Sequence, residues 1–371
     1  MAPQVSVIIP ARNEEASLGA CLESFGEQGG FSFEVIVVDD HSTDRTKEIA
    51  KSAAGVQIIE ADPLRPGWTG KNNAIATGLR LARCEWILFT DADTVHLPGS
   101  LERALSEARE YQADLLSYSP EQIAVTFWER ATLPVVFAEL ASQYPPSKVS
   151  DPNWPDAAAN GQYILVNRKA YEAIGGHAAV ASEILEDVAL ARAFKKAGYK
   201  IRFRYAPDAV RTRMYRNFRQ LREGWTKNLA LLFPDPGWLA AKTLFFWALP
   251  LFGLLMPLAV ALGVHLLRAD SRAHEIFLAL ARLIRHWFFV WYGIVAITAA
   301  HNRIGIRRAK FSSMMESLGM SFGMPMFAYL LLRSKRVHSK GSVDWKGRSY
   351  DQNDSAAKGN RQPAVSAGRI S

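Results

Sequence analysis

The sequence is poor in cysteine, with only Cys21 and Cys84 among its 371 residues. Two cysteines cannot build a disulfide framework or a metal site of the usual spacing, so we interpret both as reduced thiols in the core of a cytosolic domain. The N-terminus lacks a signal-peptide pattern and begins directly with a strand pattern. No basic run is interleaved with aromatic residues, and we therefore expect no nucleic-acid partner.

Charged residues are also missing between Thr243 and Leu267. An uncharged apolar run of this length is long enough to cross a bilayer, although buried core helices are the alternative interpretation. We predict a C-terminal transmembrane region over residues 236–335, with hydrophobic segments near 239–267, 276–300 and 313–332. The net charge of +8 includes many basic residues beside these segments, which indicates the cytoplasmic side of a membrane and anionic lipid.

The number of membrane crossings stays open. Three crossings would place the basic runs at 303–310 and 333–340 on opposite sides of the bilayer, against the tendency of such runs to stay inside. One segment could therefore be re-entrant or interfacial. Residues 336–371 are polar and rich in glycine and serine, and we predict that they form a disordered tail.

The first two thirds of the chain alternate strand and helix patterns. Mostly apolar runs predict strands at 5–9, which Pro10 ends, and at 34–38, 56–60, 86–89 and 161–166. Helix patterns begin near residues 18, 45 and 70, and Ser42 or Thr43 can cap the second of these helices. Such alternation predicts an α/β domain with a mostly parallel sheet, which we place at residues 1–235. Ligands bind such sheets beyond the carboxyl ends of the strands.

Two carboxylates, Asp91 and Asp93, follow the predicted strand at 86–89. In an extended segment, side chains two residues apart point to the same side. Two carboxylates at such a short distance repel each other unless a positive charge lies between them. A hard divalent cation that is also bound by substrate phosphates is the natural candidate for this charge. The alternative is an acidic turn in which Asp93 caps a helix. Further polar clusters, at 12–14 and at 39–40, follow neighbouring strands and favour a site at this edge.

Four motifs in this order resemble the signature set of family 2 glycosyltransferases: residues 5–14 (VSVIIPARNE), 37–44 (VVDDHSTD), 91–93 (DAD) and 186–187 (ED). The resemblance covers roughly residues 5–225. The stretches at 66–71 (PGWTGK) and 127–130 (FWER), with the apolar tail, are most similar to a narrower branch. That branch comprises the bacterial glycosyltransferases associated with hopanoid and carotenoid biosynthesis.

The resemblance implies a GT-A fold, a nucleotide-diphospho-sugar donor and a divalent cation, either Mg²⁺ or Mn²⁺. It implies that Asp39 or Asp40 accepts a hydrogen bond from the base, which we expect to be uracil, and that Asp93 is the principal metal ligand. Asp91 would contact the ribose or the metal. The other residues that it places at the donor are Pro10, Arg12, Glu14, Lys71 and Glu186.

The resemblance also implies that Asp187 is the catalytic base, which a single inverting displacement requires. The alternative is an ordinary acidic residue at a helix N-terminus. We also place Gln220, Arg222 and Trp225 at the donor, although they only loosely resemble the Gln-x-x-Arg-Trp motif of processive synthases, because here the arginine is not next to the tryptophan. That departure argues against a long-chain polysaccharide synthase.

We therefore expect an inverting, multi-pass glycosyltransferase of the inner (cell) membrane, with a cytoplasmic catalytic domain. Its partners would be a nucleotide-sugar, a lipid or membrane-delivered acceptor, and the lipid bilayer. Within the same chemistry, a polyprenyl-phosphate glycosyltransferase or a polysaccharide synthase is the alternative. From other classes, a catalytically inactive membrane scaffold or a soluble nucleotide-binding module is the alternative.

Overall fold

The computed structural model describes residues 3–30, 32–266, 311, 313–345 and 348–351, with separate residues between 275 and 304. These residues fall into two compact units. The first unit contains the described residues up to Ile123, Tyr144–Leu231 and those from Arg336 on. The second contains Ala124–Gln143 and the described residues of Leu232–Lys335. Most of the predicted segment at 276–300 lies outside the described residues.

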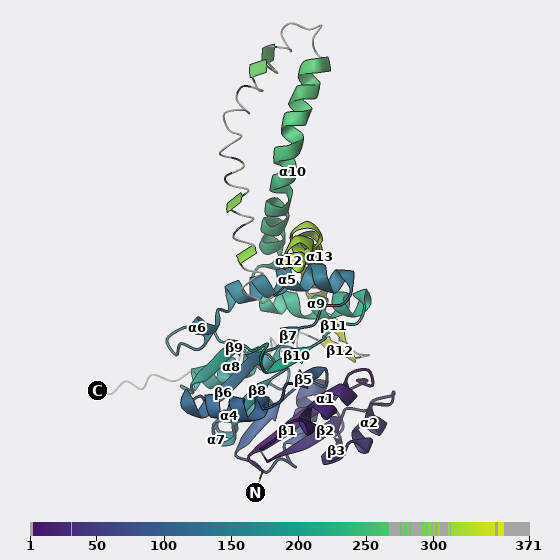
Figure 1. The fold of residues 1–371 in the computed structure, drawn as a ribbon. Helices are drawn as coiled ribbons and strands as arrows, with labels where there is room; N and C mark the ends of the chain where they lie inside the picture. Colours follow the sequence, from purple (N-terminus) through teal and green to yellow (C-terminus); the bar gives the residue numbers. More distant parts are fainter. Residues whose placement is uncertain are drawn as a thin grey trace, which may run out of the picture. The chain divides into compact units, whose positions relative to one another are not determined.

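A seven-stranded sheet with the order β3-β2-β1-β4-β8-β6-β9 forms the centre of the first unit (Figure 1). Its strands are β1 (Val5–Ala11), β2 (Phe33–Asp39), β3 (Val56–Glu60), β4 (Trp86–Phe89), β6 (Leu115–Ser119), β8 (Ile164–Asn167) and β9 (Ile201–Tyr205). Strand β8 runs antiparallel to both its neighbours, β4 and β6. The other pairings in this sheet are parallel, which confirms the mostly parallel sheet that the sequence predicts.

Helices and two small sheets complete the first unit. The helices are α1 (Leu18–Gly26), α2 (Thr46–Ser52), α3 (Gly70–Gly78), α4 (Ser100–Glu110), α6 (Pro146–Val149), α7 (Arg168–Ala173), α8 (Glu186–Lys196) and α9 (Phe218–Leu232), with a 3-10 turn, η1 (Gly176–Ala178). A three-stranded sheet consists of β5 (Thr94–His96), β10 (Val210–Thr212) and β7 (Glu121–Gln122). Strands β11 (Ser342–Trp345) and β12 (Arg348–Asp351) form an antiparallel hairpin, in a stretch for which the sequence predicted a disordered tail.

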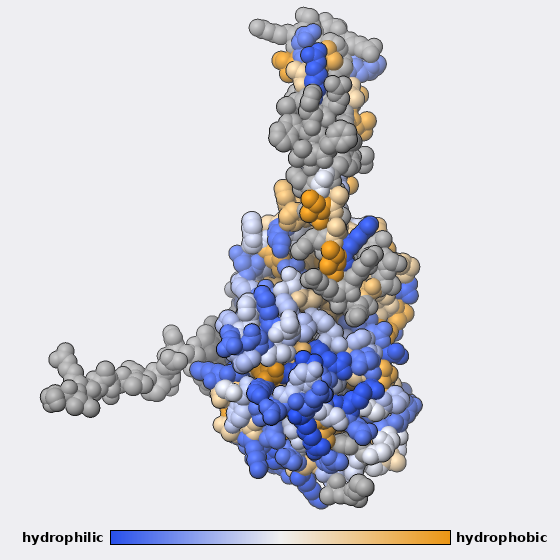
Figure 2. Space-filling model, turned by 60° about the vertical axis from the view of Figure 1, so that its left-hand side comes forward, coloured by the Kyte–Doolittle hydropathy of each residue, from blue (hydrophilic) through white to orange (hydrophobic). Residues whose placement is uncertain are grey.

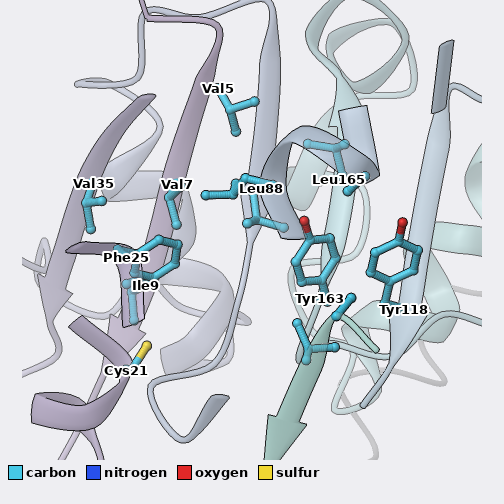
Figure 3. Packing of buried hydrophobic residues seen from close by; sticks show 14 of the residues in the cluster. Val5, Val7, Ile9, Cys21, Phe25, Val35, Leu88, Tyr118, Tyr163 and Leu165 are labelled. Atoms are coloured by element: carbon cyan, nitrogen blue, oxygen red, sulfur yellow. The ribbon is translucent and has the colours of Figure 1, made fainter. Parts of the chain in front are cut away.

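The core of the first unit lies between the sheet and α1 (Figure 3). Val7 and Ile9 of β1, Leu88 of β4 and Phe25 of α1 are all buried there. Fully burying each such side chain stabilises the fold by roughly 1.5–3 kcal/mol. Hydrophilic residues cover most of the visible face of this unit (Figure 2). The apolar side chains of the strands are buried in its interior.

Two boundaries in the first unit differ from the sequence prediction. Strand β1 does not end before Pro10 but continues to Ala11, with Pro10 opposite Val38. Helix α2 is not capped by Ser42 or Thr43, because Asp44 Oδ1 accepts the Thr46 N–H at 3.0 Å.

The second unit is helical. It contains α5 (Phe127–Gln143), α10 (Pro236–Leu266), α12 (Ser313–Leu318), the π-helix η2 (Gly319–Gly323) and most of α13 (Met324–His338). Helix α5 approaches η2 so closely that a Cβ on Gly323 would lie 1.9 Å from the Ala131 carbonyl oxygen. Pro250 and Pro257 lie inside α10 and do not end it.

Apolar side chains are exposed along α10 of the second unit. Phe245, Leu255, Leu258 and Leu266 are each more than half exposed, and hydrophobic residues of this unit are visible at its surface (Figure 2). None of the helices in the described part of the chain combines the length and the apolar character that crossing a membrane requires. The membrane-crossing segments therefore stay a prediction.

Candidate active site

The polar clusters predicted from the sequence meet at one edge of the large sheet. Arg12 follows β1, Asp40 follows β2, and Asp91 follows β4, so all three lie at carboxyl ends of parallel strands. Because β8 runs the other way, the segment before it, which includes Gly161, reaches the same edge. This edge is where ligands bind in open α/β sheets.

The acidic loop after β4 is held by hydrogen bonds from both of its sides. Thr90 Oγ1 donates to the Gln162 carbonyl oxygen at 2.8 Å, and Thr212 Oγ1 donates to the Asp93 carbonyl oxygen at 3.1 Å. Gln162 Nε2 donates to Thr212 Oγ1 at 3.1 Å and joins the two anchors. The backbone that carries Asp91 and Asp93 is thus fixed by groups outside the loop.

Lys71 lies at the centre of the site. Its Nζ is 2.7 Å from Asp91 Oδ1 and 2.6 Å from Glu186 Oε1. Burial works against the charged ammonium, but Asp91 and Glu186 together raise the pKa of Lys71 well above its usual value. Lys71 therefore stays protonated at neutral pH and joins two motifs that are 95 positions apart in the chain, Asp91 and Glu186.

Helix α3 is positioned so that Lys71 and Glu186 meet. Thr69 caps the helix by accepting the Asn72 N–H at 3.2 Å. The Asn72 side chain donates to the carbonyl oxygens of Val180 and Ala181 at 2.8 and 3.0 Å, in the segment before α8. These bonds tie the start of α3 to the start of α8, where Glu186 is the first residue.

Asp187 lies beside this cluster. Its Oδ2 accepts the Gly161 N–H at 2.9 Å and its Oδ1 accepts the Val188 N–H at 2.8 Å. Burial and the neighbouring Glu186 carboxylate raise the pKa of Asp187 to about 6, against the lowering effects of Lys71 and of the two N–H groups. A carboxylate with a pKa near the working pH is suited to accept a proton during a reaction.

A glycine allows the three charged groups to come together. A Cβ on Gly161 would lie 3.0 Å from Lys71 Nζ, 3.3 Å from Glu186 Oε1 and 3.4 Å from Asp187 Oδ2. Any side chain at this position would therefore press on the cluster. Sequence reasoning assigned Gly161 only to a predicted strand, since its neighbours in space come from two other elements.

Asp91 and Asp93 supply oxygen ligands of the kind that hard cations prefer. Their positions are also reflected at Cys21, where burial, followed by Asp93, Asp91 and Glu14, raises the thiol pKa above its usual range. Within the described residues, no group of three or more His, Cys, Asp or Glu side chains is arranged to hold a metal ion. Two carboxylates fit a cation that takes its remaining ligands from a diphosphate.

The nucleotide end that the motifs predict is built around Asp40. Arg12 Nη1 donates to the Asp40 carbonyl oxygen at 2.8 Å and lies 4.0 Å from its Oδ2. Asp39 has a local role, because its Oδ1 accepts the Ser42 N–H at 3.3 Å. Of the two aspartates that the sequence left open, Asp40 is the one that contacts the other residues of the site.

Pro10 and Glu14 flank this end. Pro10 is the second-last residue of β1 and is half-buried. The Glu14 N–H donates to Thr46 Oγ1 at 2.7 Å, and its Oε2 accepts from Ser17 Oγ at 2.8 Å. Both residues thus lie at the predicted edge, and these two hydrogen bonds of Glu14 fix the loop itself.

The three residues predicted from α9 occupy different environments. Gln220 is exposed and its Oε1 accepts the Arg216 N–H at 2.8 Å. Trp225 is buried, with its ring 6.1 Å from that of Tyr215. Arg222 is half-buried on the same helix. No contact joins Gln220 to the carboxylate cluster among the described residues, so the structure does not bring the three together as one motif.

Lys227 is a residue at the site that sequence reasoning missed. Burial lowers its pKa, while Glu186, Asp91 and Asp187 favour its charged form and Lys71 disfavours it. Lys227 therefore belongs to the same group of charges as Lys71. Its only sequence signal is its place on α9, two residues after Trp225.

Two buried histidines, His96 and His177, pack against aromatic side chains. Burial lowers the pKa of each to about 3, so both are neutral. The His96 ring packs at a tilt against Phe25, with ring centroids 4.4 Å apart, and His177 Nδ1 lies 2.7 Å from the Tyr171 hydroxyl.

Comparisons with known proteins find similar glycosyltransferases. Residues 6–175 match the family model described as glycosyl transferase family 2. The 4,4'-diaponeurosporenoate glycosyltransferase of Staphylococcus aureus strain USA300 is 29% identical over 350 residues, which cover 93% of this chain and 88% of that protein. The protein of the same name from strain MRSA252 is also 29% identical over 350 residues, with the same coverage of both chains.

A solved structure shows the same fold. It is the mannosyltransferase PcManGT from Pyrobaculum calidifontis in complex with GDP-Man and Mn²⁺, with a TM-score of 0.50 and 16% identity over 91% of this chain and 88% of that one. This likeness confirms the predicted GT-A fold. The family match and the curated relatives lead to one conclusion: residues 6–175 match glycosyl transferase family 2, and the chain is similar to the curated glycosyltransferases over 93% of its length.

Proposed function

We propose that this enzyme transfers a sugar from a nucleoside-diphosphate donor to a lipid acceptor at a membrane, with inversion at the anomeric carbon. The observation that carries the proposal is the cluster of Lys71, Asp91, Glu186 and Asp187 at the carboxyl edge of the sheet. It combines a fixed positive charge, carboxylates for a cation and one carboxylate of raised pKa, which are the groups that this transfer requires.

The start of α3 supports one continuous donor site. Gly70 lies against Asp40, since a Cβ on it would be 2.8 Å from Asp40 Oδ2. The next residue is Lys71, whose ammonium contacts Asp91 and Glu186. A donor with its base at Asp40 would therefore place its diphosphate near Lys71, where a protonated amine stabilises the negative charge that develops on the leaving phosphate.

Asp187 is proposed as the general base. With a pKa of about 6 it is mostly ionised at neutral pH and takes the proton of an attacking hydroxyl. The Gly161 and Val188 N–H groups hold its two oxygens in place, so the carboxylate does not need to reorganise during the reaction. One base and one displacement give the inverted product.

Asp91 and Asp93 are proposed to hold a divalent cation, Mg²⁺ or Mn²⁺, together with the donor phosphates. When bound, such a cation supplies Lewis-acid stabilisation of the departing diphosphate. Lys71 keeps Asp91 oriented through its 2.7 Å contact, whereas Asp93 is fixed through its backbone by Thr212.

The acceptor class is suggested by the curated relatives. Their name gives diaponeurosporenoate, a carotenoid carboxylate, as what those proteins glycosylate. We propose an apolar acceptor of this carotenoid-related kind for the present chain. A carboxylate acceptor is already ionised at neutral pH and needs no base, whereas a hydroxyl needs one. Substitution of Asp187 should therefore impair transfer to a hydroxyl acceptor but not transfer to a carboxylate acceptor.

Membrane attachment is part of the proposal, and we assign the active site to the cytoplasmic side of the inner membrane. It is supported by the uncharged run from Thr243 to Leu267 and by the exposed apolar side chains of α10. Separation of detergent-free membranes from the soluble fraction tests it. Recovery of the full-length chain in the soluble fraction would contradict it and would favour a soluble nucleotide-binding module.

Transfer in lipid nanodiscs tests the chemistry. Purified protein is given radiolabelled nucleotide-sugars with Mn²⁺ or Mg²⁺ and an extracted bacterial lipid fraction, and label in lipid is counted. We expect metal-dependent transfer that Asp93→Ala abolishes and Lys71→Met strongly lowers. Lys47→Met is the matched control, because Lys47 is ion-paired with Glu60 but exposed.

Three outcomes would redirect the proposal. Label in polyprenyl phosphate would identify a polyprenyl-phosphate glycosyltransferase, and label in long polymer would identify a polysaccharide synthase. If no nucleotide-sugar binds with either metal, the chain is a catalytically inactive scaffold and the proposal is wrong.

A further inference from the structure

We propose that Arg348, in the C-terminal hairpin, is a specificity-determining residue of the donor site. It would select nucleotides whose base carries a ring N–H beside a carbonyl, as uracil and guanine do. This inference rests on the proposed function, in which Asp40 accepts a hydrogen bond from the base.

Arg348 forms a two-point ion pair with Asp40. Its Nη1 lies 2.5 Å from Asp40 Oδ2 and its Nη2 lies 2.9 Å from Asp40 Oδ1. The side chains are nearly enclosed, with exposed fractions of 17% for Arg348 and 7% for Asp40. The parallel fork of a guanidinium on a carboxylate fixes the plane and the orientation of both groups.

Gly70 leaves the space that the Arg348 guanidinium occupies. A Cβ on Gly70 would lie 1.8 Å from Arg348 Nη1 and 3.0 Å from its Cζ. Any side chain at position 70 would therefore displace Arg348. Lys71, the proposed phosphate contact, is the residue directly after Gly70. Arg348 therefore lies next to this contact, at the end of the site where the base is expected.

The pair can exchange one of its hydrogen bonds for the edge of a base. The freed Asp40 oxygen accepts the ring N–H, and the guanidinium donates to the adjacent carbonyl oxygen, while the second Arg348–Asp40 bond is kept. Uracil and guanine present this pattern. Cytosine and adenine carry a lone pair and an amino group at the corresponding positions, so a base anchored by its ribose would meet both groups with the wrong polarity.

Nucleotide preference separates this role from a merely structural one. An arginine that only attached the hairpin to the sheet would, when removed, weaken all nucleotides equally or lower thermal stability alone. A residue that reads the carbonyl would weaken uracil and guanine nucleotides and leave cytosine and adenine nucleotides nearly unchanged. The ratio of dissociation constants is therefore the informative quantity.

The experiment measures Kd for UDP, GDP, CDP and ADP, each with Mn²⁺, on full-length protein in nanodiscs by titration calorimetry. The variants are Arg348→Ala and Arg348→Lys, which keeps the charge without the fork. Arg80→Ala is the matched control, because Arg80 also makes a two-point pair, with Asp62 at 2.9 and 2.9 Å, but on the surface. Thermal unfolding of each variant checks that it is folded.

We expect the wild type to bind UDP or GDP at least about tenfold more tightly than CDP or ADP, because buried polar groups reject a base that leaves them unpaired. Arg348→Ala should lose about tenfold or more for the preferred nucleotide, the lysine variant should lie between, and Arg80→Ala should match the wild type. Tighter UDP or GDP binding by Arg348→Ala would show that the hairpin blocks the site, and would overturn the inference. An unchanged nucleotide ratio would also overturn it. If the wild type binds none of the four nucleotides, the proposed function itself is wrong.

Discussion

The pH dependence of donor hydrolysis tests the role of Asp187 quantitatively. Its pKa of about 6 means that roughly nine-tenths of the enzyme carries the ionised base at pH 7 and roughly one-tenth at pH 5. The rate of nucleotide-sugar hydrolysis should therefore fall about tenfold between these pH values. A base with an ordinary aspartate pKa near 4 would lose little activity over the same range.

The fall in rate at low pH forms the acid limb of the pH profile. Two variants should move this limb in opposite directions. Glu186 raises the pKa of Asp187 by like-charge repulsion, so Glu186→Gln should stabilise the ionised form and shift the limb to lower pH. Lys71 lowers the same pKa, so Lys71→Met should shift the limb to higher pH, on top of its lower rate. Glu183→Gln is the control, since Glu183 is an exposed residue of the segment just before α8 and should leave the limb in place.

The assay follows release of nucleoside diphosphate in nanodiscs between pH 4.5 and 8.5, as rough limits around the pKa. Water is the acceptor, so the lipid substrate does not need to be known. A limb that stays in place in both the Glu186→Gln and Lys71→Met proteins would refute the assignment of Asp187 as the titrating base. A limb that moves the same way in both would refute the electrostatic reasoning.

Three further predictions concern the packing and charge of the site. Gly161→Ala should lower the turnover rate at least about tenfold with little change in Tm, because its Cβ would lie 3.0 Å from Lys71 Nζ. Gly78→Ala should lower stability by about 1–3 kcal/mol, since its Cβ would lie 2.7 Å from a Val38 methyl group, as denaturant unfolding can show. Asp187→Asn should raise Tm relative to wild type at pH 8 but not at pH 4, because a carboxyl with a raised folded-state pKa loses stability as pH rises towards 6.

Each of these predictions has a control and a contradicting result. For Gly78 the control is Gly26→Ala, where nothing lies within 4 Å of the added Cβ, so equal losses in both would show that packing against β2 is not the cause. Full activity of Gly161→Ala would show that the cluster has more room than the structure indicates. A Tm for Asp187→Asn below that of the wild type at pH 8 would mean that the ionised carboxylate stabilises the fold.

The central elements of the fold could be predicted because their signals are local. The almost wholly apolar run at 34–38 is typical of a strand covered on both faces, and β2 is buried from Val35 to Asp39. The parallel order then places Arg12, Asp40 and Asp91 at one edge. What a local pattern cannot show is strand direction: the run before Asn167 reads the same whether β8 is parallel or antiparallel, and only its pairing with β4 brings Gly161 to the site.

The parts of the site that were missed depend on contacts between distant segments. Arg348 reaches Asp40 from 308 positions away, and the polar composition around it predicted a disordered tail. Lys227 belongs to the charge cluster through the placement of α9, which no spacing rule specifies. Gln220 shows the opposite case: a loose motif match suggested a donor contact, yet its side chain accepts a local backbone N–H.

The anomeric configuration of the product tests the central claim most directly. An α-linked nucleotide-sugar that the wild type uses in nanodiscs is supplied, and the linkage in the product is determined by proton NMR. A single displacement with Asp187 as base predicts a β-linked product. An α-linked product would contradict the account, because retention requires a different course from one in-line attack assisted by one base.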